Sequence, residues 1–519
     1  MDKKRSILNV SVSIFSSVIL YAAAFFVRRL LIRYIGNEVN GLNSLYTSII
    51  GLLSVAELGV GSAIAFSMYK PIVQGKKSSV AALYSLFRKL YRIIGAVIFF
   101  AGLAVMPFLP RFISDYEAVN VNVYATFFLM LISIVLSYFY GAKTSLIEAY
   151  KENYITTSIL TVSKLVRYGL QIAAILIWKS FSVFLFCQIL ETLLIWGMTE
   201  KAVRRKYGDI IATQAKLDNE TKREIVRNVK AMFMHKVGTI VVNSIDSVII
   251  SSFIGVVLLG KYSNYAMIAG MMMNILALFF SPLTSVVGHL CAEGDRDRTK
   301  GYYDFFHSLN YVLGFVFFLG YYAVIDHAVS LLFGPDLRLS RAISFIITLN
   351  QFTQYMRKAT LLFRDASGAF YYDRWKPIAE GACNLALSLI FVRVFPEDFK
   401  AAGVIAATVL TTLLICDIVD PYVLFTHVFN KKPWKFYIRN YAYIAVFTVS
   451  LLLMTWLPQT RDDGLSVLLT NCLLSFGVSL AALCLVFMFD GTFRKNVRIM
   501  GYNLMAWTRK HITQFTGRT

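Results

Sequence analysis

The sequence predicts an all-α, polytopic membrane protein with about 14 transmembrane helices, arranged as two six-helix, pseudo-repeated lobes followed by two extra C-terminal helices. Three observations predict this fold. Long apolar stretches recur along the whole chain, Lys and Arg fall on alternate connections between them, and the second half repeats the first at a constant offset. Apolar residues make up 57% of the 519 residues, which leaves little chain for a globular domain outside the membrane.

Each predicted helix is a stretch of roughly 20 mostly apolar residues, the length that crosses the hydrocarbon core of a bilayer. In chain order these stretches cover residues 7–35, 42–69, 90–110, 121–147, 154–178, 181–200, 229–254, 261–290, 303–325, 341–363, 374–394, 402–425, 440–458 and 465–489. The first twelve belong to the repeated lobes, whereas the last two have no counterpart in the repeat.

The internal repeat is visible in residues other than the apolar ones. Matching residues lie 219 positions apart: Gly36 with Gly255, Gly41 with Gly260, Gly75 with Gly294, Tyr84 with Tyr303, and Gly95 with Gly314. Chance similarity between apolar helices would not keep one register on glycines and tyrosines. A unit of six helices returns to the side from which it started, so we expect a parallel repeat about an axis along the membrane normal.

Loop charge predicts the orientation of the helices and the segments of the chain. Cytoplasmic loops carry an excess of Lys and Arg, so the basic connections and both termini are expected in the cytoplasm. We expect an N-lobe over residues 1–200, a polar cytoplasmic linker over 201–228, a C-lobe over 229–426, and helices 13 and 14 with a basic cytoplasmic tail over 427–519. The net charge of +22 then indicates topology and anionic lipid headgroups, and not nucleic acid.

Motifs of catalysis or cofactor binding are missing from the sequence. The six cysteines are scattered and have no metal-ligand spacing. The stretch Gly59-Val60-Gly61 follows no strand, so it is not a nucleotide-binding loop. We therefore expect no enzyme activity, no cofactor and no metal site.

Polar stripes on two N-lobe helices contain the first candidate site residues. Arg28 ends a polar stripe on helix 1, and Lys164 and Arg167 lie on a polar side of helix 5. Ionisable side chains at membrane depth usually face a bundle interior or a water-filled cavity. We interpret all three as cavity cations; the alternative for Lys164 is an ion pair with Glu191 or Glu57 inside the lobe.

Helix 7 carries a second group, in which His235 and Asp246 share a face and Lys236 lies beside it. We expect His235 and Lys236 to face the cavity, although a lone histidine in a membrane is often only a packing residue. Asp246 and Glu57 are candidates for ion coupling, because a desolvated carboxylate can load and release a proton. The alternative is that both carboxylates neutralise nearby cations.

Charged residues near the ends of helices 10 and 12 receive simpler interpretations. Arg357, Lys358 and Arg364 approach the cytoplasmic end of helix 10, where we expect them to snorkel to the interface or to mark topology. Asp417 and Asp420, near the end of helix 12, indicate no function by themselves.

Four short motifs resemble a known family. They are Glu57-Leu58-Gly59-Val60-Gly61-Ser62-Ala63, Tyr69-Lys70-Pro71-Ile72, Phe363-Arg364-Asp365-Ala366-Ser367-Gly368, and Asp373-Arg374-Trp375-Lys376-Pro377-Ile378 with Glu380. On these residues, and over roughly residues 1–430, the chain resembles the polysaccharide transporter family, the Wzx-type flippases of the multidrug/oligosaccharidyl-lipid/polysaccharide exporter superfamily.

The resemblance implies translocation of an undecaprenyl-diphosphate-linked oligosaccharide across the bacterial inner or plasma membrane, for cell-surface polysaccharide biosynthesis. It implies alternating access through a cationic central cavity, in which Arg28, Lys164, Arg167, His235 and Lys236 would bind the diphosphate. Membrane lipids, a polysaccharide polymerase and glycosyltransferases would be its partners.

Three other functions remain as alternatives. A multidrug or cation antiporter and a lipid II flippase share the superfamily fold. A membrane polysaccharide polymerase or glycosyltransferase would have a similar number of helices, but such enzymes usually carry a long outer loop. The longest outer loop expected here, about 326–340, is short.

Overall fold

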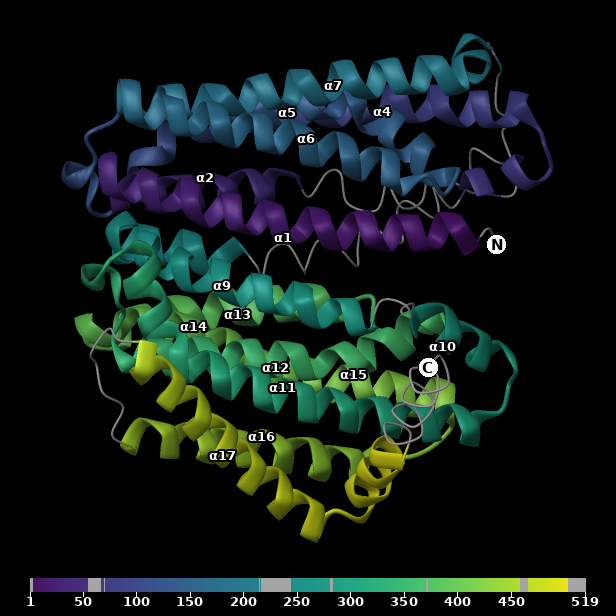
Figure 1. The fold of residues 1–519 in the computed structure, drawn as a ribbon, viewed down its shortest axis with the longest axis vertical. Coiled ribbons are helices and arrows are strands. Elements are labelled where there is room, and N and C mark those ends of the chain that lie inside the picture. The colour runs from purple at the N-terminus through teal and green to yellow at the C-terminus, as the bar shows by residue number, and fades with distance from the viewer. Residues whose placement is uncertain are drawn as a thin grey trace, which may run out of the picture. The chain divides into compact units, whose positions relative to one another are not determined.

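The computed structural model describes residues 3–54, 67–69, 71–213, 215, 244–280, 283–369, 372–457 and 465–502. All regular structure in these ranges is helical, which confirms the all-α class (Figure 1). Ten helices among the described residues are long and apolar enough to cross a membrane, and each coincides with a predicted span. Three further helices, α2 (Asn37–Leu53), α9 (Val256–Phe280) and α12 (Arg341–Ala366), lie where spans were predicted.

The chain divides into two compact units, and the first comprises residues 1–263 together with 377–385. Besides α2, its helices are α1 (Lys3–Tyr34), α4 (Lys77–Val105), α5 (Val123–Ala149), α6 (Asn153–Ala173) and α7 (Phe181–Ala212). Helix α5 packs against α4 and α7, and α6 packs against α7 and α1. Because α6 lies between α7 and α1, polar residues on its two sides can meet residues of both helices.

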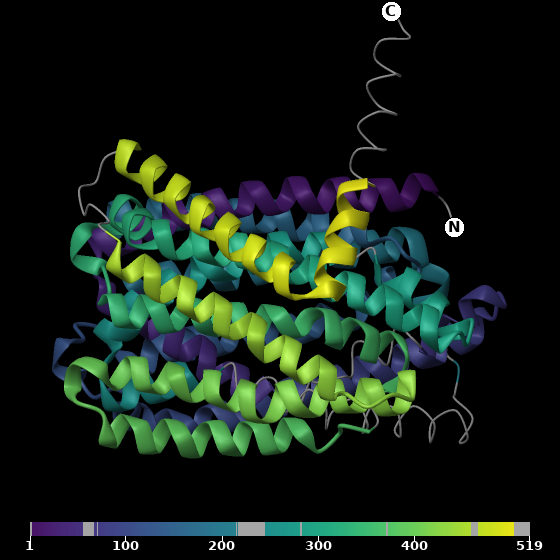
Figure 2. The same cartoon turned by 90° about the horizontal axis from the view of Figure 1, so that it is seen from below.

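The second unit comprises residues 264–376 and 386–519. Its helices include α10 (Leu283–Ala292), α11 (Arg296–Phe333), α14 (Lys400–Thr411), α15 (Asp417–Val423), α16 (Trp434–Trp456) and α17 (Leu465–Phe489). Helix α13 (Lys376–Val394) is divided, since its residues 377–385 belong to the first unit. Helix α11 packs against α12, α16 and α17 around an aromatic core, in which the rings of Phe352 and Phe447 stack 3.7 Å apart. Figure 2 shows the ribbon of α17 in yellow. The two C-terminal helices are thus bound to this unit by aromatic packing.

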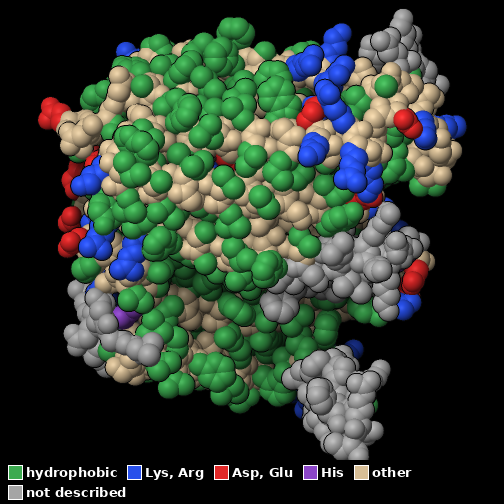
Figure 3. All heavy atoms as spheres, turned by 45° about the horizontal axis from the view of Figure 1, so that its top comes forward, with side chains coloured by type: hydrophobic (Ala, Val, Ile, Leu, Met, Phe, Trp, Pro, Cys, Tyr) green, Lys and Arg blue, Asp and Glu red, His purple; other side chains and the backbone are tan. Residues whose placement is uncertain are grey.

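The outer surface is apolar in the way that lipid contact requires. Figure 3 shows a face on which apolar side chains cover a broad area, with Lys and Arg gathered toward its margins. Large apolar side chains such as Leu473 and Trp456 are 73% and 85% exposed. Exposure of such residues in water would be costly, whereas contact with lipid tails satisfies them.

The backbone itself repeats at the predicted offset. Gly36 and Gly255 have φ angles of 135° and 134°, and Gly75 and Gly294 have φ angles of 67° and 78°. Helix α4 begins at Lys77 and α11 begins at Arg296, again 219 residues later. Glycine is the residue that adopts positive φ without steric cost, so the matched glycines mark equivalent turns in the two halves.

Several helix ends differ from the sequence prediction. Helix α7 continues to Ala212, past the expected end at residue 200. Helix α11 continues to Phe333, so Asp326 lies inside a helix and only residues 334–340 remain of the outer loop expected over 326–340. The Asp326 carboxylate accepts hydrogen bonds from Tyr265 and Ser344 at 2.6 and 3.0 Å, which allows an acidic residue inside the helix. Hydropathy alone reads such a residue as a loop.

The predicted twelfth span also departs from one regular helix. It consists of α14, a π-helical segment over Thr412–Cys416, α15, and a second π-helical segment over Leu424–Phe429. Pro421 lies inside α15 and cannot donate a backbone hydrogen bond, and such positions are relieved by local changes in helix winding. The irregular winding places Asp417 and Asp420 in the interior of the unit, where both are buried.

Candidate functional site

Three of the predicted site residues lie outside the described residues: Glu57, His235 and Lys236. The motif Glu57-Leu58-Gly59-Val60-Gly61-Ser62-Ala63 also falls there. The other four candidates, Arg28, Lys164, Arg167 and Asp246, are described and all belong to the first unit.

Arg28 lies on α1 with its side chain half-buried, in contrast to the exposed Arg29 and Arg33. Its Nη1 donates a hydrogen bond to the backbone carbonyl oxygen of Ser263 at 2.9 Å. Tyr168 of α6 lies within electrostatic range of the guanidinium. A single carbonyl partner leaves most of the five guanidinium N–H donors free for another acceptor.

Arg167 lies next to Tyr168 on α6 and forms an ion pair inside the first unit. Its Nη1 is 3.0 Å from a carboxylate oxygen of Glu191 on α7, and its guanidinium lies 4.7 Å from the centre of the Tyr168 ring. Glu191 is only 8% exposed, so this pair is well shielded. Glu191, which we considered as a partner for Lys164, thus pairs with Arg167 instead.

Lys164 lies one turn before Arg167 on the same side of α6, and its side chain is half-buried. Among the described residues, no carboxylate lies within ion-pairing distance of Lys164 or of Arg28. Tyr168 lies within electrostatic range of Arg28, and both Arg167 and Lys164 lie within electrostatic range of Glu191. The described part of the cluster therefore contains three cations and one paired carboxylate, Glu191, and has a surplus of positive charge.

Asp246 lies in the helical segment 244–253 of the first unit and is 6% exposed. Tyr262 at the start of α9 lies within electrostatic range of its carboxylate. Asp246 is thus a buried carboxylate beside a tyrosine hydroxyl. This geometry is compatible with either interpretation made from the sequence, ion coupling or charge neutralisation.

The close contact between α2 and α9 in the first unit is formed by equivalent positions of the two repeats. A methyl carbon on Gly41 of α2 would lie 1.9 Å from the carbonyl oxygen of Val256, and one on Gly260 of α9 would lie 2.4 Å from the carbonyl oxygen of Asn37. Gly41 and Gly260 are repeat partners, and so are the positions of Asn37 and Val256. Each half therefore presents the same patch to the other, as in the interface of a symmetric dimer.

Polar side chains reinforce this contact. Asn40 donates to the carbonyl oxygen of Gly260 at 3.0 Å and to the hydroxyl of Ser263 at 3.0 Å. The Asp115 carboxylate accepts hydrogen bonds from the backbone N–H groups of Val256 and Val257, at 2.7 and 3.1 Å. A carboxylate at the first turn of a helix satisfies unpaired N–H groups and interacts favourably with the helix dipole. Asp115, which precedes the short helical turn Tyr116–Ala118, thus ties this loop to α9.

A second buried ionic network lies in the second unit, centred on Asp420. Its carboxylate lies 3.2 Å from Arg357, 3.2 Å from Arg364 and 2.6 Å from Lys376. Arg364 also pairs with Asp373 and Asp365. The expectation that Arg357 and Arg364 snorkel was wrong, because they are 9% and 3% exposed and fully paired. Sequence reasoning missed the network because its central carboxylate, Asp420, lies 63 positions from Arg357 and 56 positions from Arg364.

The two networks differ in charge balance. In the second unit each of the three cations, Arg357, Arg364 and Lys376, has a carboxylate within ion-pairing distance, as expected of a structural network. In the first unit, the described residues offer no carboxylate within ion-pairing distance of Arg28 or Lys164. Among the described residues, no group of three His, Cys, Asp or Glu side chains could hold a metal ion. The cluster at Arg28 and Lys164 is thus the better candidate for an anionic ligand.

Comparison with known proteins indicates the family and the fold of the chain. A family model described as a polysaccharide biosynthesis protein matches residues 6–286, more than half of the chain. A solved structure of the lipid II flippase MurJ in an inward closed conformation is similar with a TM-score of 0.61 and 12% sequence identity, over 93% of this chain and 99% of that one. An inward-facing multidrug resistance MATE family transporter of the MOP superfamily is similar with a TM-score of 0.59 and 12% identity, over 85% of this chain and 99% of that one.

No curated protein sequence matches the chain. At 12% identity, the structural likenesses carry the fold and not the substrate. Together with the apolar helices, they identify a multi-pass membrane protein with a polytopic helical fold.

Proposed function

Because the chain belongs to the polysaccharide biosynthesis protein family, we propose that it is a flippase for an undecaprenyl-diphosphate-linked oligosaccharide. It moves this lipid from the cytoplasmic to the outer face of the bacterial inner or plasma membrane. Both termini of the chain face the cytoplasm. The substrate is made in the cytoplasm by glycosyltransferases and is passed on to a polymerase outside. The family match over residues 6–286 supports the substrate class.

One observation carries the proposal: Arg28 and Lys164 are half-buried cations without an ion-pair partner among the described residues. A diphosphate cannot enter hydrocarbon without compensating charge. The guanidinium of Arg28 presents several donors in one plane and suits phosphate oxygens, and Lys164 adds a point charge. His235 and Lys236 of the second half complete the proposed binding site, and Arg167 is held in position by Glu191.

Transport by alternating access requires the α2–α9 contact to open and close. Glycines at positions 41 and 260 allow the two helices to touch closely, and the contact is held by a few hydrogen bonds such as those of Asn40, which can break without repacking an apolar core. Residues 1–200 and 229–426 act as the two moving lobes in this scheme. Glu57 and Asp246 are the proposed coupling groups.

The test is transport in proteoliposomes with an undecaprenyl-diphosphate oligosaccharide labelled on the glycan. A membrane-impermeant quencher measures how much label reaches the outer leaflet over time. Loss of one charge-assisted contact costs about 1.5–3 kcal/mol, so Arg28→Gln and Lys164→Gln should each slow transport at least about tenfold. Arg29→Gln is the matched control, since Arg29 is exposed and lies one residue away. Normal transport by both site variants would remove these residues from the binding site.

An alternative is a lipid II flippase, because the chain shares the fold of MurJ and lipid II also carries a diphosphate. The same vesicles loaded with labelled lipid II distinguish the two. Transport of lipid II with no transport of the oligosaccharide would replace our proposal. A multidrug or cation antiporter is disfavoured by the positive charge at Arg28 and Lys164, which repels organic cations.

A further inference from the structure

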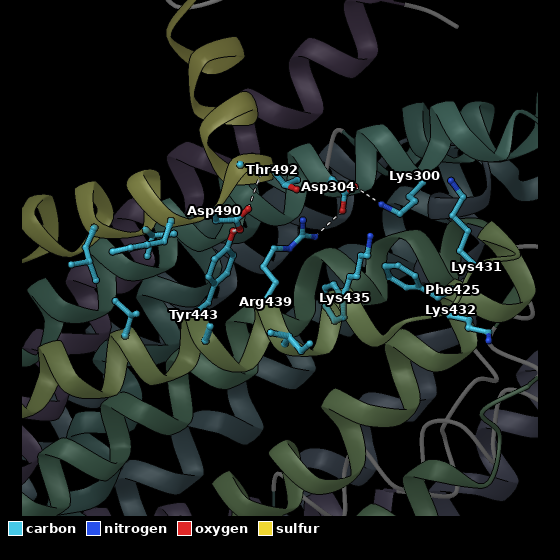
Figure 4. Close-up of a pocket in the computed structure, with 18 residues that line it drawn as sticks. Lys300, Asp304, Phe425, Lys431, Lys432, Lys435, Arg439, Tyr443, Asp490 and Thr492 are labelled. Atoms are coloured by element: carbon cyan, nitrogen blue, oxygen red, sulfur yellow. Dashed lines mark hydrogen bonds and ion pairs between the residues drawn. The ribbon is translucent and has the colours of Figure 1, made fainter.

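A pocket of about 780 Å³ opens in the second unit between α11, α16, α17 and the helical segment 491–502 (Figure 4). It shares no residue with the proposed transport site. One part of its lining is charged and the other part is apolar. Together the two parts define the class of ligand.

The charged part of the pocket holds more cations than carboxylates. Its cations are Lys300, Lys431, Lys432, Lys435 and Arg439, and its carboxylates are Asp304 and Asp490. Figure 4 shows Lys300, Lys435 and Arg439 directed toward the same opening beside Asp304. The pocket therefore carries a net positive charge at the end that the sequence places in the cytoplasm.

Both carboxylates are already engaged. Asp304 accepts hydrogen bonds from Lys300 and, at 2.7 Å, from Arg439. Asp490 accepts from the Tyr443 hydroxyl at 2.7 Å and from the backbone N–H of Thr492 at 2.8 Å, so it serves as a helix cap. Lys431 forms an ion pair with Asp297, which lies outside the pocket lining. Neither pocket carboxylate neutralises Lys432 or Lys435.

Two lysines and one guanidinium nitrogen have unused capacity. Among the described residues, no carboxylate lies within ion-pairing distance of Lys432 or Lys435. The Nε of Arg439 is buried and has no hydrogen-bond partner among them. Lys435 lies in the first turn of α16, where the helix dipole also favours an anion. An anion with several oxygens would use these donors together.

The apolar part of the pocket continues along the helices toward the membrane interior. Ile438, Ala442 and Val446 of α16 face Leu485, Val486 and Phe489 of α17 across it. Ile438 and Phe489 are 73% and 83% exposed, which leaves a strip of apolar surface open. A ligand that fits both parts has an anionic head and a hydrocarbon chain.

We propose that this pocket binds an anionic glycerophospholipid of the cytoplasmic leaflet. Lys435 and Arg439 hold the phosphate, Lys432 lies at the rim, and an acyl chain lies between α16 and α17. Charge complementarity favours this occupant: cytoplasmic leaflets are rich in anionic lipids, and each basic residue near such a surface strengthens binding. Through this bound lipid, the α16–α17 pair anchors the second unit to the cytoplasmic leaflet.

The experiment measures lipid binding to the purified full-length protein by native mass spectrometry in detergent. Phosphatidylglycerol is titrated against phosphatidylcholine with the same acyl chains. Three variants are compared: Lys432→Gln/Lys435→Gln, which removes two cations of the pocket; Ala442→Trp, which fills its apolar part; and Lys201→Gln/Arg205→Gln. The last is the matched control, since both residues are exposed cations at the C-terminal part of α7 and lie outside the pocket.

We expect the tightest phosphatidylglycerol binding to weaken by about tenfold or more in both pocket variants and to stay unchanged in the control. Phosphatidylcholine binding should be weak and alike in all variants. Unchanged phosphatidylglycerol binding in both pocket variants overturns the proposal, and so does an equal loss in the control, which would indicate surface charge in general.

Two competitors distinguish the source of the phosphate. Glycerol 3-phosphate should not displace phosphatidylglycerol at equal concentration; displacement would make this a site for soluble phosphates and overturn the lipid assignment. Preferential displacement by undecaprenyl phosphate would assign the pocket to the transported lipid instead. These outcomes are independent of the transport assay, so this proposal can fail while the flippase proposal stands.

Discussion

Substitution of Gly41 by alanine should open the contact between α2 and α9. The added methyl carbon would lie 1.9 Å from the carbonyl oxygen of Val256 and 3.0 Å from the backbone nitrogen of Gly260. An ordinary carbon–oxygen contact is about 3.4 Å or longer, so the helices must separate by about 1.5 Å. The obstacle is backbone, which cannot rotate away as a side chain can. Overpacking of this kind costs about 1–3 kcal/mol, which shifts the balance between closed and open contact by roughly 5- to 150-fold.

The assay is the rate of thiol labelling at one engineered cysteine, Ser263→Cys, in a chain whose six native cysteines have been replaced. Ser263 is 8% exposed and accepts from Asn40 across the contact, so its labelling reports opening. Gly41→Ala should raise the labelling rate at least fivefold, and Gly260→Ala should act alike, because its methyl carbon would lie 2.4 Å from the Asn37 carbonyl oxygen.

Gly169→Ala and Gly197→Ala are the matched controls, since a methyl carbon at either position meets no atom within 4 Å. They should leave labelling unchanged and slightly stabilise their helices. If Gly41→Ala folds with an unchanged unfolding midpoint and an unchanged labelling rate, the contact does not hold the helices together. The proposal that the α2–α9 contact opens and closes during transport would then be wrong.

Three further predictions concern charge and topology. Asp420→Asn removes the common partner of three buried cations and should lower the free energy of unfolding by about 3–5 kcal/mol, which the thermal unfolding midpoint measures. Asp365→Asn is the control and should change the midpoint little, because the Asp365 side chain is 57% exposed. Glu57→Gln or Asp246→Asn should abolish the response of transport to an imposed proton or sodium gradient; a normal response in both variants would assign the carboxylates to charge neutralisation. Reporter fusions should place both termini in the cytoplasm, and an external signal from either would contradict the topology.

Much of the fold could be predicted from sequence because a bilayer imposes the same requirement on every span, namely a helix of roughly 20 mostly apolar residues. Hydropathy located the helices, and the 219-residue offset located equivalent turns at Gly36 and Gly255, whose φ angles agree within 1°. Helix ends were less certain. Asp326 and the segment beyond residue 200 are polar but helical, since hydroxyl partners and interfacial positions satisfy them.

The candidate site was only partly accessible from sequence. The depth of Arg28 and Lys164 in polar stripes indicated their environment, but not which of the cations had partners. Glu191 lies 24 positions from Arg167, and Asp420 lies 63 positions from Arg357. Helical periodicity predicts which side chains are neighbours three or four residues apart on one helix. It does not predict ion-pair partners on another helix. For this reason Arg357 and Arg364 were taken for interfacial residues although they form a buried network.

The sequence by itself determined the all-α class, the span pattern and the repeat, because each depends on local hydropathy or on a fixed offset. The tertiary structure decided which charges are compensated. It pairs Arg167 with Glu191 and surrounds Asp420 with three cations, whereas Arg28 and Lys164 have no carboxylate within ion-pairing distance in the part of the chain that the structure describes. The physical reason is that an ion pair depends on distance in space, and helix packing sets that distance between residues that lie far apart in the chain.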